Sequence, residues 1–157
     1  RADPAGSCQG AVNSSAWGMD LATARTHIQQ HLERMSAACR RPLFDEWAVL
    51  SLGEDTRGVP AYSGPRPDVF RRTLLADTVP LRAVAAGRKF ANGDFEFAVD
   101  GHGTRYDALM MLGPTSYLVC SHTEKSLGEI RADPNWLKAQ AIFFELGEKF
   151  RNDPLSG

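Results

Sequence analysis

Two histidines are the residues of this chain whose setting could support chemistry. His102 lies between Gly101 and Gly103 in a predicted hairpin turn, and His122 lies near the end of a later predicted strand. A histidine held in such a turn can present its ring to a substrate. The simpler interpretation is that the glycines make the turn and His102 points outward. An enzyme that uses His102 or His122 would need a pocket that joins either ring to a carboxylate with a perturbed pKa.

The other metal-capable side chains do not form a recognisable pattern. His27 and His31 are one helical turn apart, a spacing that can hold a metal when a third ligand converges. No carboxylate or cysteine in the local pattern completes a site, so a solvated or half-packed role is expected. Three cysteines, far apart and odd in number, argue against a disulfide framework and a zinc ribbon: Cys8, Cys39 and Cys120. The sequence predicts no metal site and no cofactor.

Sequence motifs of catalysis are also missing. The chain contains neither a Gly-x-x-x-x-Gly-Lys loop nor a Gly-x-Gly-x-x-Gly loop for phosphates. Ser51 and Ser63 lack the glycine setting of a nucleophile elbow. Its acidic residues form no isolated pair on an apolar background, so no general acid and base can be named. A catalytic role is therefore not predicted.

Basic and aromatic residues supply the candidate interaction surface. Arg71 and Arg72 fall on a predicted helix whose simplest role is a solvated face, with an acidic partner as the alternative. The phenylalanines fall where a sheet and its covering helix would meet, so core packing is a simpler explanation than a cofactor pocket. The candidate interaction or ligand surface comprises Arg66, Arg71, Arg72, His102, Tyr106 and His122.

Length and charge restrict the class of protein. A chain of 157 residues is long enough for one domain with a core of its own. Lys and Arg number 18 against 19 Asp and Glu, so nucleic acid is not an expected partner. No apolar run approaches the roughly 20 residues that span a bilayer, and no start resembles a signal peptide. A cytoplasmic protein without membrane contact is the default expectation.

The stretch from Gly93 to Phe150 organises the predicted fold. Apolar residues alternate with mostly polar ones from Phe95 to Asp100, the period-2 pattern of a half-buried strand. Turn residues separate this strand from two more, Tyr106 to Leu112 and Tyr117 to Thr123. Asp133 is expected as the N-cap of a final helix that ends near Phe150. Its apolar residues form a face wide enough to cover the sheet and also to meet a second copy: Trp136, Leu137, Phe143, Phe144, Leu146 and Phe150.

The remaining elements precede this stretch. Asp20 is expected to cap an amphipathic helix that runs to about Cys39. In the last helix, Gly147 is unfavourable for a helix interior and is expected to permit a close contact. Residues 1–18 are predicted to be a flexible or vector-derived extension of a single domain, 19–152. The other predicted elements are a buried strand at 46–52, a weaker strand at 59–63 and two short helices at 67–77 and 79–86, with a polar link at 126–133 before the last helix.

This α-β-β-α-β-β-β-α order resembles the roadblock family of dynein light-chain type, within the longin and profilin-like group. The resemblance is carried by Trp47 to Ser51 as first strand, Asp68 to Ala86 as crossover helix and Phe95 to Thr123 as meander. It implies an α+β sandwich of two or three layers around a mixed, mostly antiparallel five-stranded sheet. Pro80 within the crossover helix departs from the family pattern.

Three functional hypotheses follow. The resemblance implies a non-enzymatic module that forms a homodimer, by edge-to-edge pairing of its sheet or by its crossover helix, and that binds a small GTPase or a scaffold. The alternative is a small-molecule sensing domain of profilin-like or PAS-like type, with an apolar pocket lined by Phe95, Phe97 and Tyr106. The third is an enzyme that uses His102 or His122.

Overall fold

A computed structural model of the chain describes residues 18–51, 61–65, 90–99, 106–122 and 127–156. Several predicted features lie outside these residues: the extension at 1–17, the helices at 67–77 and 79–86, and the turn around His102. No helix in the described part is both long and apolar enough to span a bilayer.

The described chain contains an open sheet with five strands. They are β1 (Glu46–Ser51), β2 (Ala61–Ser63), β3 (Phe95–Val99), β4 (Tyr106–Gly113) and β5 (Ser116–His122). Their spatial order is β2-β1-β5-β4-β3, and all four pairings are antiparallel. This confirms the predicted α+β class and the five-stranded sheet, and the fold is consistent with a roadblock-like one. The prediction allowed a mixed sheet, whereas these four pairings are all antiparallel. β2 and β3 form the two edges of the sheet.

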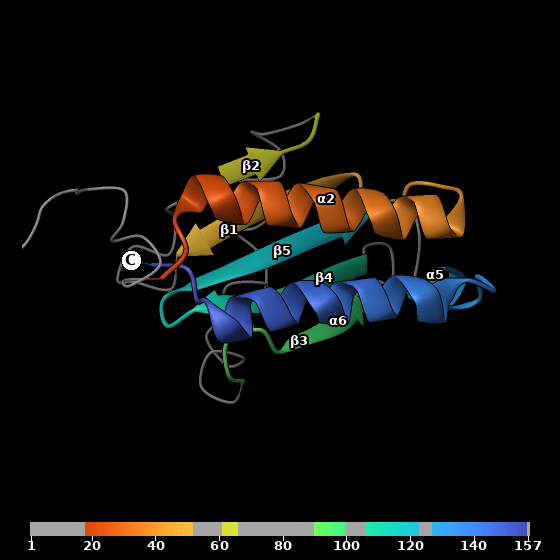
Figure 1. Ribbon diagram of the computed structural model, residues 1–157. Helices are drawn as coiled ribbons and strands as arrows, with labels where there is room; N and C mark the ends of the chain where they lie inside the picture. The colour runs from red at the N-terminus through yellow and green to blue at the C-terminus, as the bar shows by residue number, and fades with distance from the viewer. Residues whose placement is uncertain (1–17, 52–60, 66–89, 100–105, 123–126, 157) are drawn as a thin grey trace, which may run out of the picture.

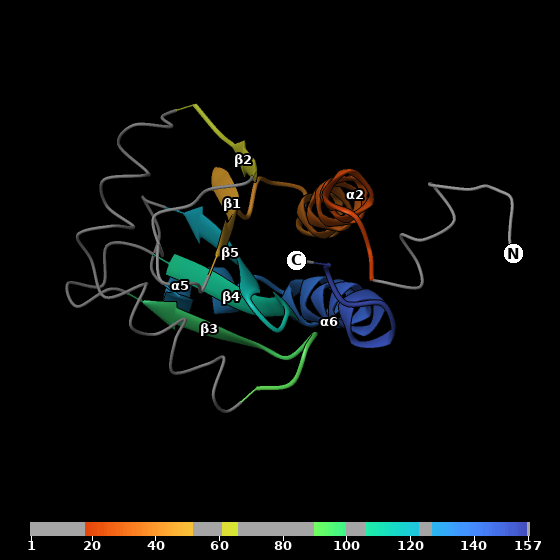
Figure 2. The same cartoon turned by 90° about the vertical axis from the view of Figure 1, so that its left-hand side faces the viewer.

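Two long helices cover one face of this sheet. α2 (Leu21–Cys39) and α6 (Trp136–Asn152) lie side by side in one layer (Figures 1 and 2). They run antiparallel, since Met19 bridges Leu155 at one end of the layer and Arg41 pairs with Asp133 at the other. The Asp20 carboxylate accepts from the Thr23 amide at 2.8 Å, which confirms the predicted N-cap of α2.

The start of α6 differs from the prediction. The predicted polar link contains a short helix, α5 (Leu127–Arg131), and the N-cap of α6 is Asn135, which makes no side-chain capping bond. Asp133, the predicted cap, instead accepts from the Asn135 amide at 2.8 Å and pairs with Arg41 at 3.0 Å. Because a turn and an ion pair occupy this carboxylate, the helix begins later.

Both faces of the sheet are buried. Beneath the helices, the core combines β-strand residues such as Met110, Leu118 and Cys120 with Ile28 of α2 and Phe143 of α6. A second apolar cluster occupies the opposite face, formed by Ala48, Leu50, Leu109, Met111, Tyr117 and Val119. The prediction that the strand beginning at Glu46 is buried on both faces is confirmed.

Glycines allow α6 to approach the sheet closely. A Cβ atom at Gly147 would collide with the Gly93 carbonyl oxygen, and one at Gly93 would collide with the Gly147 carbonyl oxygen. Gly93 also has a φ of 87°, which glycine adopts without strain. The predicted close contact at Gly147 is therefore confirmed.

Candidate functional site

The structure describes two of the six predicted site residues. Arg66, Arg71, Arg72 and His102 lie outside the described residues, and their roles stay predictions. Tyr106 and His122 are direct partners across β4 and β5, with exposed fractions of 0% and 7%. Both side chains are buried, and the interaction role predicted for them stays a prediction.

Aromatic rings surround Tyr106 on both sides. Its ring is stacked with Phe44 at a centroid distance of 5.4 Å and with Phe97 at 6.0 Å. Trp136 approaches Tyr106 edge-on at 6.3 Å, and Phe143 lies 5.5 Å from Phe97. These rings fill the space that a ligand would need in the sensing hypothesis. At this location the structure shows an aromatic core.

The buried hydroxyl and thiols are poor acids at neutral pH. No atom in the described part of the chain makes a hydrogen bond with the Tyr106 hydroxyl, and burial raises the pKa of Tyr106 far above its usual value. Burial likewise raises the pKa of the Cys120 thiol and of the Cys39 thiol. Since the thiolate is the nucleophilic form, neither cysteine is poised for covalent catalysis.

The two histidines on α2, His27 and His31, contact each other across one helical turn. Nδ1 of His31 lies 2.6 Å from the His27 carbonyl oxygen, and the two rings are 6.4 Å apart in an edge arrangement. Burial lowers the pKa of His31. Within the residues that the structure describes, no group of three His, Cys, Asp or Glu side chains could hold a metal ion. His31 therefore acts as a buried packing residue of α2.

A row of polar side chains crosses the sheet on the face away from α2 and α6. Ser121 of β5 pairs in register with Glu46 of β1 on one side and with Asp107 of β4 on the other. Its hydroxyl donates to an Asp107 oxygen at 2.6 Å, and the Tyr62 hydroxyl donates to Glu46 at 2.6 Å. Glu46, Asp107 and Ser121 are at most 2% exposed.

Sequence reasoning missed this row. The two carboxylates are far apart along the chain, and only the strand register brings them to either side of Ser121. A possible signal was the single acid in each of two otherwise apolar strands, Glu46 and Asp107. Satisfied buried polar rows favour one strand register over others, because a shift would leave the charged groups unpaired.

A groove opens between α2 and the start of β1. Its volume is about 350 Å³, at the lower end of the range for ligand pockets. Carboxylates and apolar groups line it together: Gln29, Leu32, Glu33, Ser36, Pro42, Phe44, Asp45, Glu46, Trp47 and Ser63.

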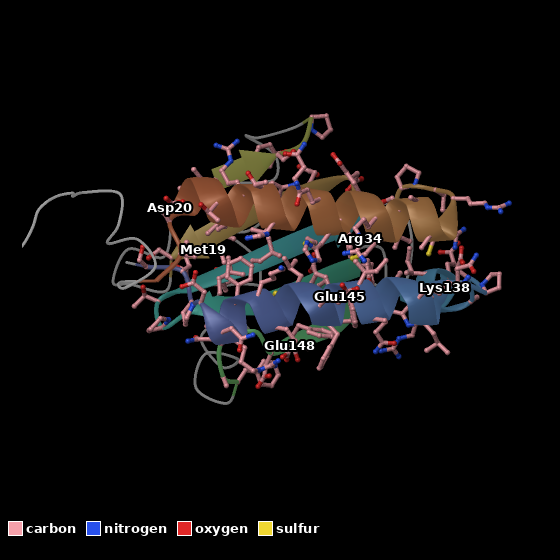
Figure 3. All side chains as sticks on the ribbon, in the orientation of Figure 1. Met19, Asp20, Arg34, Lys138, Glu145 and Glu148 are labelled. Carbon is pink, nitrogen blue, oxygen red and sulfur yellow. The ribbon has the colours of Figure 1, made fainter. Side chains whose placement is uncertain are left out.

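The outer face of α6 carries exposed apolar groups. Leu137 and Phe144 are 76% and 53% exposed, and in the described part of the chain no other large hydrophobic side chain is exposed. The Arg151 guanidinium lies over the Phe144 ring, 5.8 Å from its centroid. Beside them, Glu145 pairs with Arg34 of α2 at 3.1 Å (Figure 3). This face combines apolar and charged groups as interaction surfaces do.

Comparison with known proteins yields similarity at the level of solved structures only. No family model and no curated protein matches the chain. Among solved structures, MglB of Myxococcus xanthus is 16% identical with a TM-score of 0.43, covering 80% of this chain and 90% of that one. MglC of Myxococcus xanthus is 12% identical with a TM-score of 0.46, covering 80% and 97%. The gliding protein MglB of Thermus thermophilus is 15% identical with a TM-score of 0.44, covering 80% and 92%.

Proposed function

We propose that this chain is a non-enzymatic regulatory module that forms a homodimer and binds a protein partner. The observation that carries this proposal is the outer face of α6, where Leu137 and Phe144 are exposed on one helix. Contiguous exposed apolar surface marks interaction sites, and Leu137 and Phe144 lie seven residues apart, on the same side of α6. By contrast, the described side chains that could take part in catalysis are buried: Tyr106, Cys120 and His122.

The class of partner follows from the roadblock resemblance. A small GTPase or a larger scaffold is the partner that such a module serves, and the cytoplasm is the compartment in which it would meet them. Function is decided by surfaces and sites and not by the fold alone, so a direct binding test identifies the class of partner.

The test is affinity purification of the tagged full chain from cells of its source organism. One half of the lysate is loaded with GDP and the other with a non-hydrolysable GTP analogue. We expect recovery of a small GTPase in one nucleotide state, or of a scaffold protein in both. Recovery of neither class, from bait shown to be folded by circular dichroism, would overturn the proposed partner.

The groove beside α2 favours a second candidate function, the sensing of a small molecule. Its volume of about 350 Å³ suits a small ligand, and Trp47 and Phe44 offer apolar contact near the Glu33 carboxylate. A screen of metabolites by thermal shift tests this function. A ligand that raises the melting temperature of the wild type, and not of Gln29→Trp, a change at an exposed position of the groove lining, would support binding in the groove.

A further inference from the structure

We infer that the outer face of α6 pairs with the same face of a second copy, antiparallel, about a two-fold axis at Ala141. This inference rests on the proposed homodimer and names its interface. The face is defined by Leu137, Lys138, Ala141, Phe144 and Glu145, and none of these residues belongs to the buried core.

Helix geometry arranges these residues in an apolar row and a charged row, with Ala141 between them. Leu137 and Phe144 are seven residues apart and form the apolar row, and Ala141 follows the spacing of four and three that places it on the same face. Lys138 and Glu145 are seven residues apart, so they form a parallel row two turns long on the side toward α2. Figure 3 shows both along α6, with Arg34 of α2 beside Glu145. Ala141 lies between the apolar row and the charged row.

A two-fold axis at Ala141 makes this face complementary to itself. Antiparallel pairing about this axis brings Leu137 level with Phe144 of the second copy, to within one residue rise of about 1.5 Å. The same rotation brings Lys138 level with Glu145 of the second copy. Each apolar contact and each ion pair then occurs twice, as in any isologous interface.

Ala141 permits the close approach that this pairing needs. A small side chain at the crossing point lets two helix backbones come near to the roughly 8 Å end of the usual range of interaxial distances. Larger residues on either side, Leu137 and Phe144, would then pack around it. Their exposed fractions of 76% and 53% leave most of the Leu137 side chain and about half of Phe144 available for burial.

Charge distinguishes the antiparallel arrangement from a parallel one. In a parallel pair, the row of Lys138 and Glu145 would face the apolar row of the second copy, so neither charge would meet an opposite one. In the antiparallel pair, each Lys138 meets an acid, and Glu145 adds a second cation to its existing pair with Arg34. Surface pairs contribute little energy individually, but they favour the antiparallel orientation because only that orientation forms them.

The expected dimer is weak. One exposed leucine and one phenylalanine per copy offer less than the roughly 800 Å² per partner of a standard interface. We therefore expect a dissociation constant in the micromolar range, with fast exchange between monomer and dimer.

Exchange of the two charges tests the pairing. In Lys138→Glu, both ion pairs of the homodimer become repulsive, and the same holds for Glu145→Lys. We expect each single variant to dissociate about tenfold more readily than the wild type, as measured by sedimentation equilibrium. An equimolar mixture of the two variants restores opposite charges at both pairs, so it should form a heterodimer with nearly wild-type affinity.

A matched control separates this pairing from a general effect of charge. Arg25→Glu makes the same change of charge at an exposed site on α2, away from the face, and should leave the dissociation constant unchanged. If the wild type dimerises, and both single variants dimerise equally well without a preference in the mixture, the α6 interface is wrong while the homodimer stands. If the wild type is monomeric at all concentrations, the proposed homodimer itself fails.

Discussion

Replacing Gly147 by alanine tests whether α6 is fixed by its contact with the turn at Gly93. The added Cβ would collide with the Gly93 carbonyl oxygen. That turn cannot retreat easily, because Gly93 donates to the Met111 carbonyl at 2.7 Å and Met111 donates to Asp94 at 3.0 Å. Forcing a methyl group into such a contact costs about 1–3 kcal/mol. Alanine favours a helix interior by about 1 kcal/mol over glycine.

The steric cost and the gain in helix propensity act in opposite directions, so the sign of the change in the free energy of unfolding shows which of them is larger. We expect Gly147→Ala to lower the free energy of unfolding by about 1 kcal/mol, read from urea denaturation with an unchanged m-value. Position 30, exposed on α2, supplies the control. There Gln30→Ala should be more stable than Gln30→Gly by about 1 kcal/mol, since propensity acts alone. A similar gain at Gly147 would show that α6 does not need the glycine, and would refute the close approach.

Three further changes have defined outcomes. Tyr106→Phe should leave stability to urea unchanged or raise it by about 1 kcal/mol, because the hydroxyl is buried without a partner in the described residues; a loss would reveal a partner. Leu155→Ala should cost about 2–4 kcal/mol, since the Leu155 side chain is 5% exposed and packs in the core cluster under the helices; a change under about 1 kcal/mol would show that this end packs loosely. Burial lowers the pKa of His31, so the unfolded chain takes up a proton first as pH falls below about 6.5. Stability should therefore decline as the pH falls through about 6.5, and the stability of His31→Leu should decline less; parallel curves would contradict this.

Local patterns predicted the sheet and the first helix well. Period-2 alternation placed the strand beginning at Phe95, and turn residues placed the strands beginning at Tyr106 and Tyr117, all to within a residue. Asp20 capped α2 as expected. Both signals depend on neighbouring residues only. The start of α6 was placed too early because Asp133 is used by Arg41, a residue distant in the chain.

The surfaces were harder to predict than the elements. The sequence assigned Phe143 and Phe144 to one face of the last helix, but adjacent helical residues point about 100° apart. Phe143 is fully buried and Phe144 is half exposed. The row formed by Glu46, Ser121 and Asp107 depends on strand register, which no local pattern contains.

The most direct test of the proposed module is its mass in solution. Light scattering across a concentration series of the wild-type chain should show a transition from the chain mass of 17.2 kDa to twice that mass in the micromolar range. This result would establish self-association, which the regulatory module and the α6 interface both require. A constant mass of 17.2 kDa up to high micromolar concentration would contradict the account.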